Sequence, residues 1–164
     1  MSTAEDDFHA FVVARTRALS RTAYLLTGDA HLAEDLVQTA LFKAARSWQR
    51  IQGSPEAYVR RILYTQNISW WRTRRVKETA LGSYDAPAAT GDPDLRVTLE
   101  QALAGLTTRQ RTVLVLRYFE DLTEVQTAAA LGIGAGTVKS ITRQALARLR
   151  TLAPELAELV GADS

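Results

Sequence analysis

The stretch "LTEVQTAAALGIGAGTVKSITRQ", residues 122–144, predicts two helices joined by a tight turn. Thr123 and Gln126 have the spacing of a capping box, so a short helix begins there. Gly132 supplies the residue with positive φ that ends this helix. A small residue is needed where two helices cross steeply, and Ala128 takes that place. The pattern is therefore typical of a helix-turn-helix.

The second helix, expected from about Ala135 to Leu152, combines an apolar stripe with a polar edge. Arg and Lys bind guanine O6 and N7, Gln reads adenine, and a hydroxyl at a helix start can hold a phosphate. We therefore predict that this edge enters the major groove of DNA, the alternative being a helical hairpin with a solvated face. The inward positions are Val138, Ile141, Ala145 and Leu149, and the edge consists of Thr137, Lys139, Ser140, Arg143 and Gln144.

The loop "GIGAG" between these helices also allows a second interpretation, as a phosphate-cradling loop. It lacks a preceding strand, and it has neither the G-x-G-x-x-G spacing nor the Lys-Ser/Thr pair of a P-loop. The turn of a helix-turn-helix is the stronger interpretation.

Every other periodic segment also repeats at helix spacing. A first helix is predicted to stop near Gly28, Asp29 can cap a second, and Ser54 with Pro55 opens a third that runs to about Arg75. Residues 78–93 are rich in Gly, Pro and small residues and read as a flexible linker. We therefore predict an all-α chain of two small helical domains, residues 5–77 and 94–160.

In the second domain, Asp92 and Pro93 are expected to open a helix that runs to Gly105. Thr107 with Gln110 forms another capping box, and Pro154 is expected to close the last helix.

Composition narrows the function classes. The chain has 164 residues and no cysteine, which excludes disulfides and thiolate metal sites. It shows no signal peptide and no apolar run long enough to span a membrane, so a cytoplasmic location is expected.

The net charge is only +2, yet residues 58–77 hold six cations and no acid, and residues 136–151 hold four and no acid. Two such runs suggest two contacts with a polyanion, unless both are solvated helix faces.

The first basic run contains "NISWWRTRRVK", residues 67–77, with two adjacent tryptophans. Trp70 lies on the inner stripe of the third helix with Val59 and Leu63, and we interpret it as a core residue. Trp71 falls on a second apolar stripe with Tyr64 and Ile68. Beside so many cations, Trp71 is the ring placed to meet a partner with a π-face and negative charge.

The segments "AEDLVQTALFKAARSW", "PEAYVRRILYTQNISWWRTRR" and "LTTRQRTVLVLRYFEDLTEVQTAAALGIGAGTVKS" resemble, in that order, parts of an extracytoplasmic-function sigma factor. These are small bacterial members of the sigma-70 family that keep only its second and fourth domains. The resemblance covers about residues 5–155, and "ISWWRTRR" looks like an actinobacterial subgroup. It departs from the family at Gln126-Thr127-Ala128, where Glu-Ile-Ala is usual, so Thr127 fills an inward position poorly.

The resemblance implies the function of a sigma factor, which binds core RNA polymerase and directs it to promoters without an enzymatic activity or cofactor of its own. The helix with Asp35, Gln38, Leu41 and Phe42 would dock on the clamp helices of the polymerase's largest subunit. The loop from Gln49 to Ser54 and the helix after it would hold the minus-10 element, and the last helix would read the minus-35 element. Promoter melting would involve Asn67, Trp71, Arg72, Arg74 and Arg75.

Further partners are also implied by the resemblance. The flap of the second-largest polymerase subunit is one, and the linker would thread the RNA-exit path of the polymerase. An anti-sigma factor is common in this family, but the sequence bears no mark of one.

Two other function classes compete with a sigma factor. A stand-alone DNA-binding regulator with the same motif would leave the first basic run, the tryptophans and the linker without a purpose. An enzyme would need a nucleophile–base pair or a set of metal ligands, and the nearest candidate is His31 with Glu34 and Asp35. That trio is better read as a polar helix face.

Overall fold

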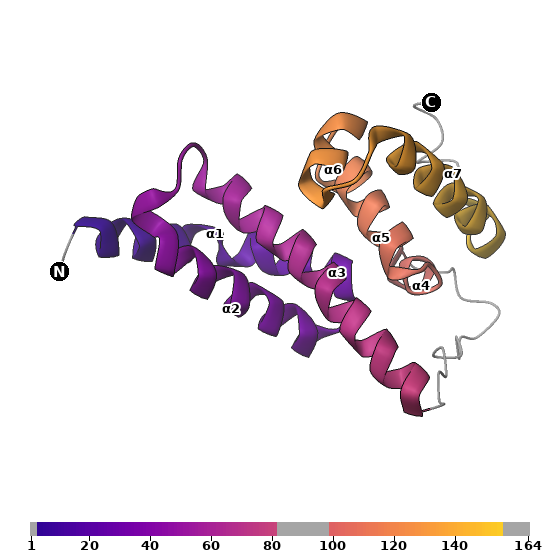
Figure 1. Cartoon of the computed structure of the whole chain (residues 1–164), viewed down its shortest axis with the longest axis horizontal. Helices are drawn as coiled ribbons and strands as arrows, with labels where there is room; N and C mark the ends of the chain where they lie inside the picture. Colours follow the sequence, from indigo (N-terminus) through magenta and orange to yellow (C-terminus); the bar gives the residue numbers. More distant parts are fainter. Residues whose placement is uncertain (1–2, 82–98, 156–164) are drawn as a thin grey trace. The chain divides into compact units, whose positions relative to one another are not determined.

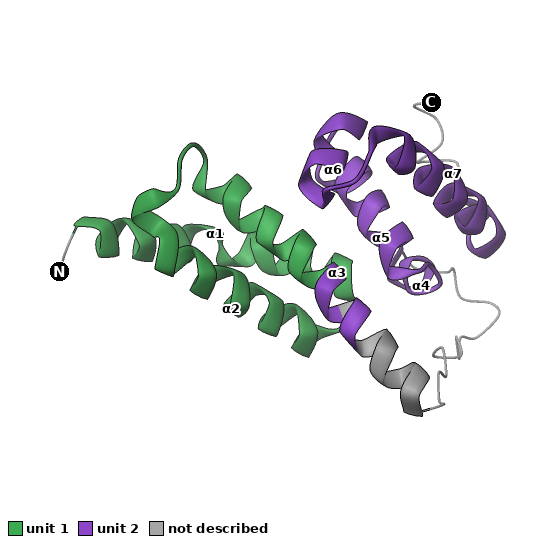
Figure 2. Ribbon diagram, viewed as in Figure 1, with its two compact units in different colours: residues 1–67 green, residues 68–164 purple. Residues whose placement is uncertain are grey.

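The computed structural model describes residues 3–81 and 99–155, and all regular structure in those two ranges is helical (Figure 1). The chain divides into two compact units, residues 1–67 (unit 1) and residues 68–164 (unit 2) (Figure 2). The predicted all-α class with two helical domains is confirmed. The division falls inside one long helix rather than at its end.

Unit 1 is built on three helices: α1 (Thr3–Thr27), α2 (Ala30–Ser47) and the first part of α3 (Pro55–Leu81). A short 3-10 turn, η1 (Trp48–Arg50), follows α2. Gly28 has φ of +70° and ends α1, and the Asp29 side chain accepts a hydrogen bond from the backbone N–H of Leu32 at 3.0 Å. Both predicted signals are confirmed. The buried core comes from all three helices and includes Leu19, Leu26, Leu36, Ala40, Val59 and Leu63.

The third helix is longer than predicted. We expected it to end at about Arg75 and the linker to begin at residue 78, but α3 continues to Leu81. The physical reason is that residues 76–81, "VKETAL", include neither glycine nor proline, and the first helix-breaking residue is Gly82. The predicted start of the next helix at Asp92 and Pro93 lies outside the described residues.

Unit 2 contains α4 (Leu99–Ala104), α5 (Thr108–Leu114), α6 (Glu124–Leu131) and α7 (Ala135–Leu152). Both predicted capping boxes are present. Thr107 and Gln110 bond each other's backbone N–H at 3.1 and 3.2 Å, and Thr123 and Gln126 do so at 3.0 and 2.9 Å. The last helix has the predicted bounds and ends two residues before Pro154.

The structure adds a π-helix, η2 (Val115–Phe119), directly after α5. The capping box at Thr107 predicts only where α5 begins, and side-chain periodicity does not separate the wider π turn from an α turn. After η2 the backbone reaches Asp121 with φ of 55°, and α6 begins three residues later.

Candidate nucleic-acid and polymerase interfaces

The helix-turn-helix of unit 2 has a small, well-filled core. Val113, Ala128, Val138 and Ile141 are buried together, with Leu131 and Ile133 packed against them. Gly132 takes φ of +69° and donates its backbone N–H to the carbonyl oxygen of Ala128. A β-carbon at this position would meet no neighbour, so the conformation, rather than space, favours glycine here. The predicted roles of Ala128, Val138 and Ile141 are confirmed.

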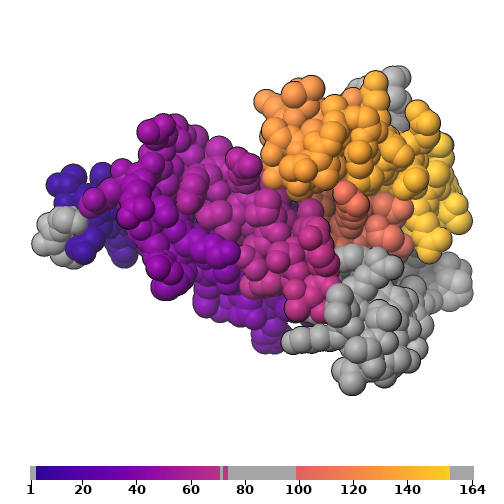
Figure 3. All heavy atoms as spheres, viewed as in Figure 1, coloured from indigo at the N-terminus to yellow at the C-terminus, as the bar shows by residue number. Residues whose placement is uncertain are grey.

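The opposite face of α7 is open to solvent. All five residues of the predicted reading edge are exposed, while the four inward residues are buried. In the space-filling view of Figure 3 the orange and yellow atoms of α6 and α7 lie at the surface. The helix starts after Gly134 with no acidic residue in its first turn, so its amino-terminal N–H groups and the edge favour an anion. The exposed edge consists of Thr137, Lys139, Ser140, Arg143 and Gln144.

One arginine organises the loop that leads into α6. The Nη1 of Arg117 donates a hydrogen bond to the carbonyl oxygen of Leu122 at 2.7 Å, and its guanidinium lies 5.8 Å from the centre of the Tyr118 ring. Leu122 is the residue before the Thr123 cap, so Arg117 connects η2 to the start of the helix-turn-helix. Sequence reasoning did not single out Arg117, because the bond depends on the π-helix.

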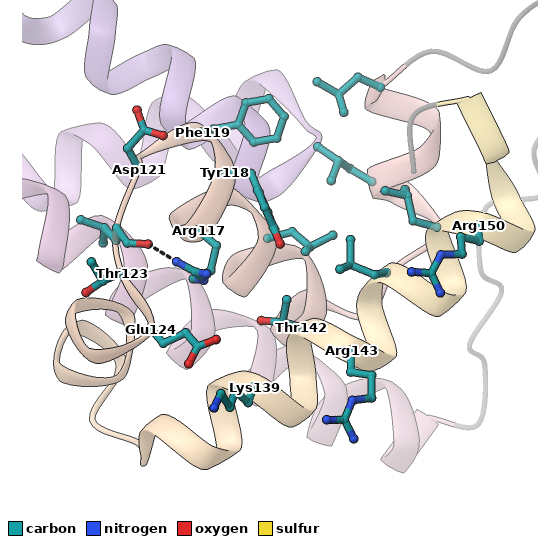
Figure 4. A pocket seen from close by; sticks show the side chains of 16 residues that line it. Arg117, Tyr118, Phe119, Asp121, Thr123, Glu124, Lys139, Thr142, Arg143 and Arg150 are labelled. Atoms are coloured by element: carbon teal, nitrogen blue, oxygen red, sulfur yellow. Dashed lines mark hydrogen bonds between the residues drawn. The ribbon is translucent and has the colours of Figure 1, made fainter. Parts of the chain in front are cut away.

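A groove with a volume of about 970 Å³ lies beside α7, within unit 2. Figure 4 shows Lys139, Arg143 and Arg150 projecting from α7 and Arg117 bonded across to the loop. The groove therefore combines an apolar interior with a rim on which cations outnumber acids. Its leucines are Leu99, Leu103, Leu114, Leu122, Leu146 and Leu149, its cations Arg117, Lys139, Arg143 and Arg150, and its acids Asp121 and Glu124.

In unit 1, the predicted polymerase-binding residues share one outward region of α2. Asp35 and Gln38 are exposed and Leu41 is half-buried, whereas Phe42 leaves 64 % of its surface exposed. The guanidinium of Arg46, one turn further along α2, lies 5.9 Å from the centre of the Phe42 ring. An exposed aromatic ring beside a cation is a typical anchor for a protein partner. The sequence pattern does not single out Arg46.

The predicted minus-10 and melting residues fall into different environments. Arg72 is exposed, but Asn67 is only 6 % exposed, so a direct contact of Asn67 with DNA would require its side chain to leave its present surroundings. The side chains of Trp71, Arg74 and Arg75 lie outside the described part of the chain. Tyr64, which we placed on an outer apolar stripe with Trp71, is buried at 3 % exposure. The expected second apolar face of α3 is therefore wrong at Tyr64, which belongs to the core of unit 1. Trp70, interpreted as core, is half-buried.

The loop from Gln49 to Ser54 is exposed at five of its six residues, and Ile51 is half-buried. Trp48, just before it, packs against Phe8 and Phe11 of α1, with ring centres 5.2 and 5.3 Å apart. A hollow of about 500 Å³ beside these rings is lined by Arg46, Gln49 and Arg50, among others.

Just after the loop, Glu56 accepts hydrogen bonds from two arginines. Arg15 of α1 reaches it through Nη2, and Arg60 of α3 through Nε at 3.0 Å. Burial alone raises the pKa of Glu56, but the hydrogen bonds and charges of Arg15 and Arg60 bring that pKa below its ordinary value. Arg60 also donates to the hydroxyl of Thr22 at 2.8 Å.

Neither a metal site nor a membrane span is found in the described ranges. Across residues 3–81 and 99–155, His31, Glu34 and Asp35 do not form part of any group of three or more His, Asp or Glu side chains that could hold a metal ion. Among the same residues no helix is long and apolar enough to cross a membrane.

Comparison with known proteins agrees with this geometry. Residues 11–76 match the family model of sigma-70 region 2, and residues 102–151 match that of sigma-70 region 4. The RNA polymerase sigma-E factor of Streptomyces coelicolor is 40% identical over 149 residues, which cover 88% of this chain and 84% of the relative. The ECF RNA polymerase sigma factor SigL of Mycobacterium tuberculosis is 34% identical over 152 residues, or 84% of each chain.

A solved structure is similar as well. The sigma factor RpoE of Bartonella quintana, in complex with the anti-sigma factor NepR, has a TM-score of 0.68 and 29% sequence identity, covering 89% of this chain and 96% of that chain. The two matched regions define the class, a sigma-70-type transcription initiation factor. More narrowly, the chain belongs to the extracytoplasmic-function sigma factors of that family. A stand-alone helix-turn-helix regulator is thereby set aside.

Proposed function

We propose that this sigma factor directs core RNA polymerase to promoters through two separate DNA contacts, one from each predicted domain. The observation that supports this most directly is the two-sided character of α7: its apolar residues are buried and its five polar edge residues are exposed. In this proposal Arg143 and Gln144 read base edges of the minus-35 element, and Thr137 and Lys139 hold the backbone.

The second contact is assigned to the minus-10 element. The exposed loop from Gln49 to Ser54 would hold this element, and the exposed Arg72 would bind phosphate near the point of strand opening. Trp71, Arg74 and Arg75 retain their proposed melting roles on the strength of the family resemblance. Stacking of one aromatic ring on an unpaired base contributes about 1–3 kcal/mol. Trp71, rather than one of the neighbouring arginines, is therefore proposed to bind a base exposed by melting.

Docking on the polymerase is assigned to two surfaces. The exposed Phe42, with Asp35, Gln38 and Leu41, would bind the clamp helices of the largest subunit. The groove of unit 2, with its leucine-lined interior, suits an apolar helix such as one from the flap of the second-largest subunit.

We assign the chain the role of a specificity subunit that contributes no catalytic group and requires no cofactor. It would act in the cytoplasm, where the polymerase acts. An anti-sigma factor is a candidate partner because the structurally similar RpoE is in complex with one.

The proposed boundaries are residues 5–77 for the first domain and 94–160 for the second. The proposed linker of residues 78–93 overlaps the end of α3, because the helix itself includes residues 78–81.

The test is run-off transcription with sigma-free bacterial core polymerase, a fragmented genomic library and the purified protein. We expect protein-dependent transcripts whose promoters share an upstream element and a start-proximal element at a fixed distance. Absence of such transcripts, together with tight binding of the protein alone to duplex DNA, would contradict the proposal.

A further inference from the structure

The exposed loop from Gln49 to Ser54 is anchored at both ends on the same helix. At the start of the loop, the Trp48 ring packs against Phe8 and Phe11 of α1. At its end, Glu56 in the first turn of α3 accepts a hydrogen bond from Arg15 of α1. The loop therefore begins and ends on α1, although α1 is more than twenty residues away in sequence.

The contact residues of α1 lie on one face. At about 100° per residue, Phe8, Phe11, Arg15 and Thr22 fall within about 60° of one another around the helix. At 1.5 Å per residue, the aromatic contacts and Arg15 are about 6 to 10 Å apart along the helix axis. Six loop residues could span roughly 20 Å if extended. The loop must therefore fold outward, and Gly53, with φ of +82°, supplies a turn.

The anchor at the end of the loop is reinforced from α3 itself. Arg60 binds the same Glu56 carboxylate oxygen as Arg15, through Nε and Nη2. The third guanidinium nitrogen of Arg60, Nη1, donates to the hydroxyl of Thr22. Thr22 is buried at 5 % exposure, which fixes Arg60 against α1. Ser54 caps the helix start by accepting from the backbone N–H of Ala57 at 3.3 Å. Thus the position and the direction of the first turn of α3 are both defined.

We infer that Arg15, Glu56 and Arg60, with Trp48 at the opposite end, are positioning residues that set the shape of the loop and thereby the sequence preference of this protein at the minus-10 element. This inference rests on the proposed function of the loop. None of the four has to touch DNA. They act by holding the two loop ends at a fixed separation, so that the exposed Gln49, Arg50 and Gln52 reach the nucleic acid in one arrangement.

The experiment compares Glu56→Gln and Arg15→Met with the parent protein in transcription from a promoter library randomised separately in the minus-10 and the minus-35 element. Arg15→Lys, which keeps the charge, is the rescue variant. Gln66→Met is the matched control, because it removes another hydrogen bond between neighbouring helices, from Lys43 Nζ to Gln66 Oε1 at 2.6 Å, away from the loop. Circular dichroism at the assay temperature identifies folded variants.

We expect Glu56→Gln and Arg15→Met to reduce the preference at the minus-10 element about fivefold, with the minus-35 preference unchanged, and Arg15→Lys to restore much of it. An unchanged minus-10 preference in folded Glu56→Gln protein, with a lower melting temperature, would overturn the inference and leave the proposed function intact. The same selective loss of minus-10 preference in the Gln66→Met control would overturn it too, because that bond lies away from the loop. If the parent itself shows no minus-10 preference, the proposed function fails and the inference fails with it.

Discussion

Arg117 Nη1 donates a hydrogen bond to the carbonyl oxygen of Leu122 across the turn between the π-helix and α6. The bond joins residues separated by four others, and one of these four is Asp121, whose positive φ is unusual for a residue other than glycine. It places the Thr123 capping box, and with it the first helix of the helix-turn-helix. The stability of unit 2 therefore depends in part on this single side chain, which holds a short loop in place.

Replacing Arg117 by alanine should lower the stability of unit 2 by about 1–3 kcal/mol, because the carbonyl of Leu122 loses a charged donor. Chemical denaturation monitored by circular dichroism measures the change. Arg109→Ala is the control, since Arg109 is an exposed arginine of α5, and it should change stability by less than about 0.5 kcal/mol. Equal stability of the two variants would show that the bond is not made in solution.

Thr127→Val should stabilise the protein by about 1 kcal/mol. Thr127 is fully buried, and within residues 3–81 and 99–155 its hydroxyl finds no hydrogen-bond partner. The valine has the same shape without the unsatisfied polar group. Thr142→Val is the control, because the buried Thr142 hydroxyl does donate to the carbonyl oxygen of Val138 at 2.7 Å. Opposite signs for the two variants are expected in thermal unfolding, and a loss of stability in both would refute the prediction.

Lys139→Ala and Arg143→Ala should both weaken binding to the minus-35 element. We expect Arg143→Ala to cost about 1–3 kcal/mol and to relax base preference, since a bidentate contact to a base is lost. Lys139→Ala should weaken binding similarly across sequences and reduce its salt dependence. Binding to a randomised upstream library at two salt concentrations separates these effects. Arg17→Ala, an exposed cation of α1, serves as the control.

Phe42→Ala should weaken binding to core polymerase by about 2 kcal/mol, in the range of an interface anchor, and leave stability almost unchanged. The ring is mostly exposed in the free protein, so its removal creates no cavity. Val13→Ala is the matched control: this side chain is 72% exposed on α1, outside the proposed surface. Titration of labelled protein with core polymerase gives both affinities, and similar losses for the two variants would contradict the assignment.

Acid should weaken unit 1 through Glu56. The folded-state pKa of Glu56 lies below its ordinary value, so its stabilising contribution is fully present above the unfolded pKa of about 4.3. This contribution is lost as the pH falls through the folded pKa. Because the pair is partly exposed, we expect less than about 1 kcal/mol. Glu56→Gln should flatten the acid limb of the stability–pH curve, and an unchanged curve would exclude a role for this carboxylate.

The helix-turn-helix was predictable in detail because its signals are local. Thr123, Gln126 and Gly132 determine where α6 begins and ends, and the apolar spacing after Ala135 determines which face of α7 is buried. The exposed reading edge follows directly from that burial. Residues that act through short-range spacing could thus be placed without a structure.

Other features depend on contacts between distant segments and could not be read in this way. The burial of Tyr64 and Asn67 reflects the packing of three helices rather than the periodicity of α3 alone. The π-helix at Val115–Phe119 has no sequence signature of its own, so Arg117 was not recognised. The pairing of Arg15 with Glu56 joins residues 41 positions apart, which a single sequence does not reveal.

The two units begin their helices with different chemistry. In unit 2 the capping boxes of α5 and α6 use hydroxyl and carboxamide groups, neither of which ionises. In unit 1, α2 starts on the carboxylate of Asp29, and the first turn of α3 is held through the carboxylate of Glu56. Protonation of the Glu56 carboxylate would therefore loosen the start of α3, whereas the caps of α5 and α6 carry no group that can take up the proton. Because the pKa of Glu56 lies below its ordinary value, this difference between the units is confined to strong acid, below the ordinary glutamate pKa of about 4.3.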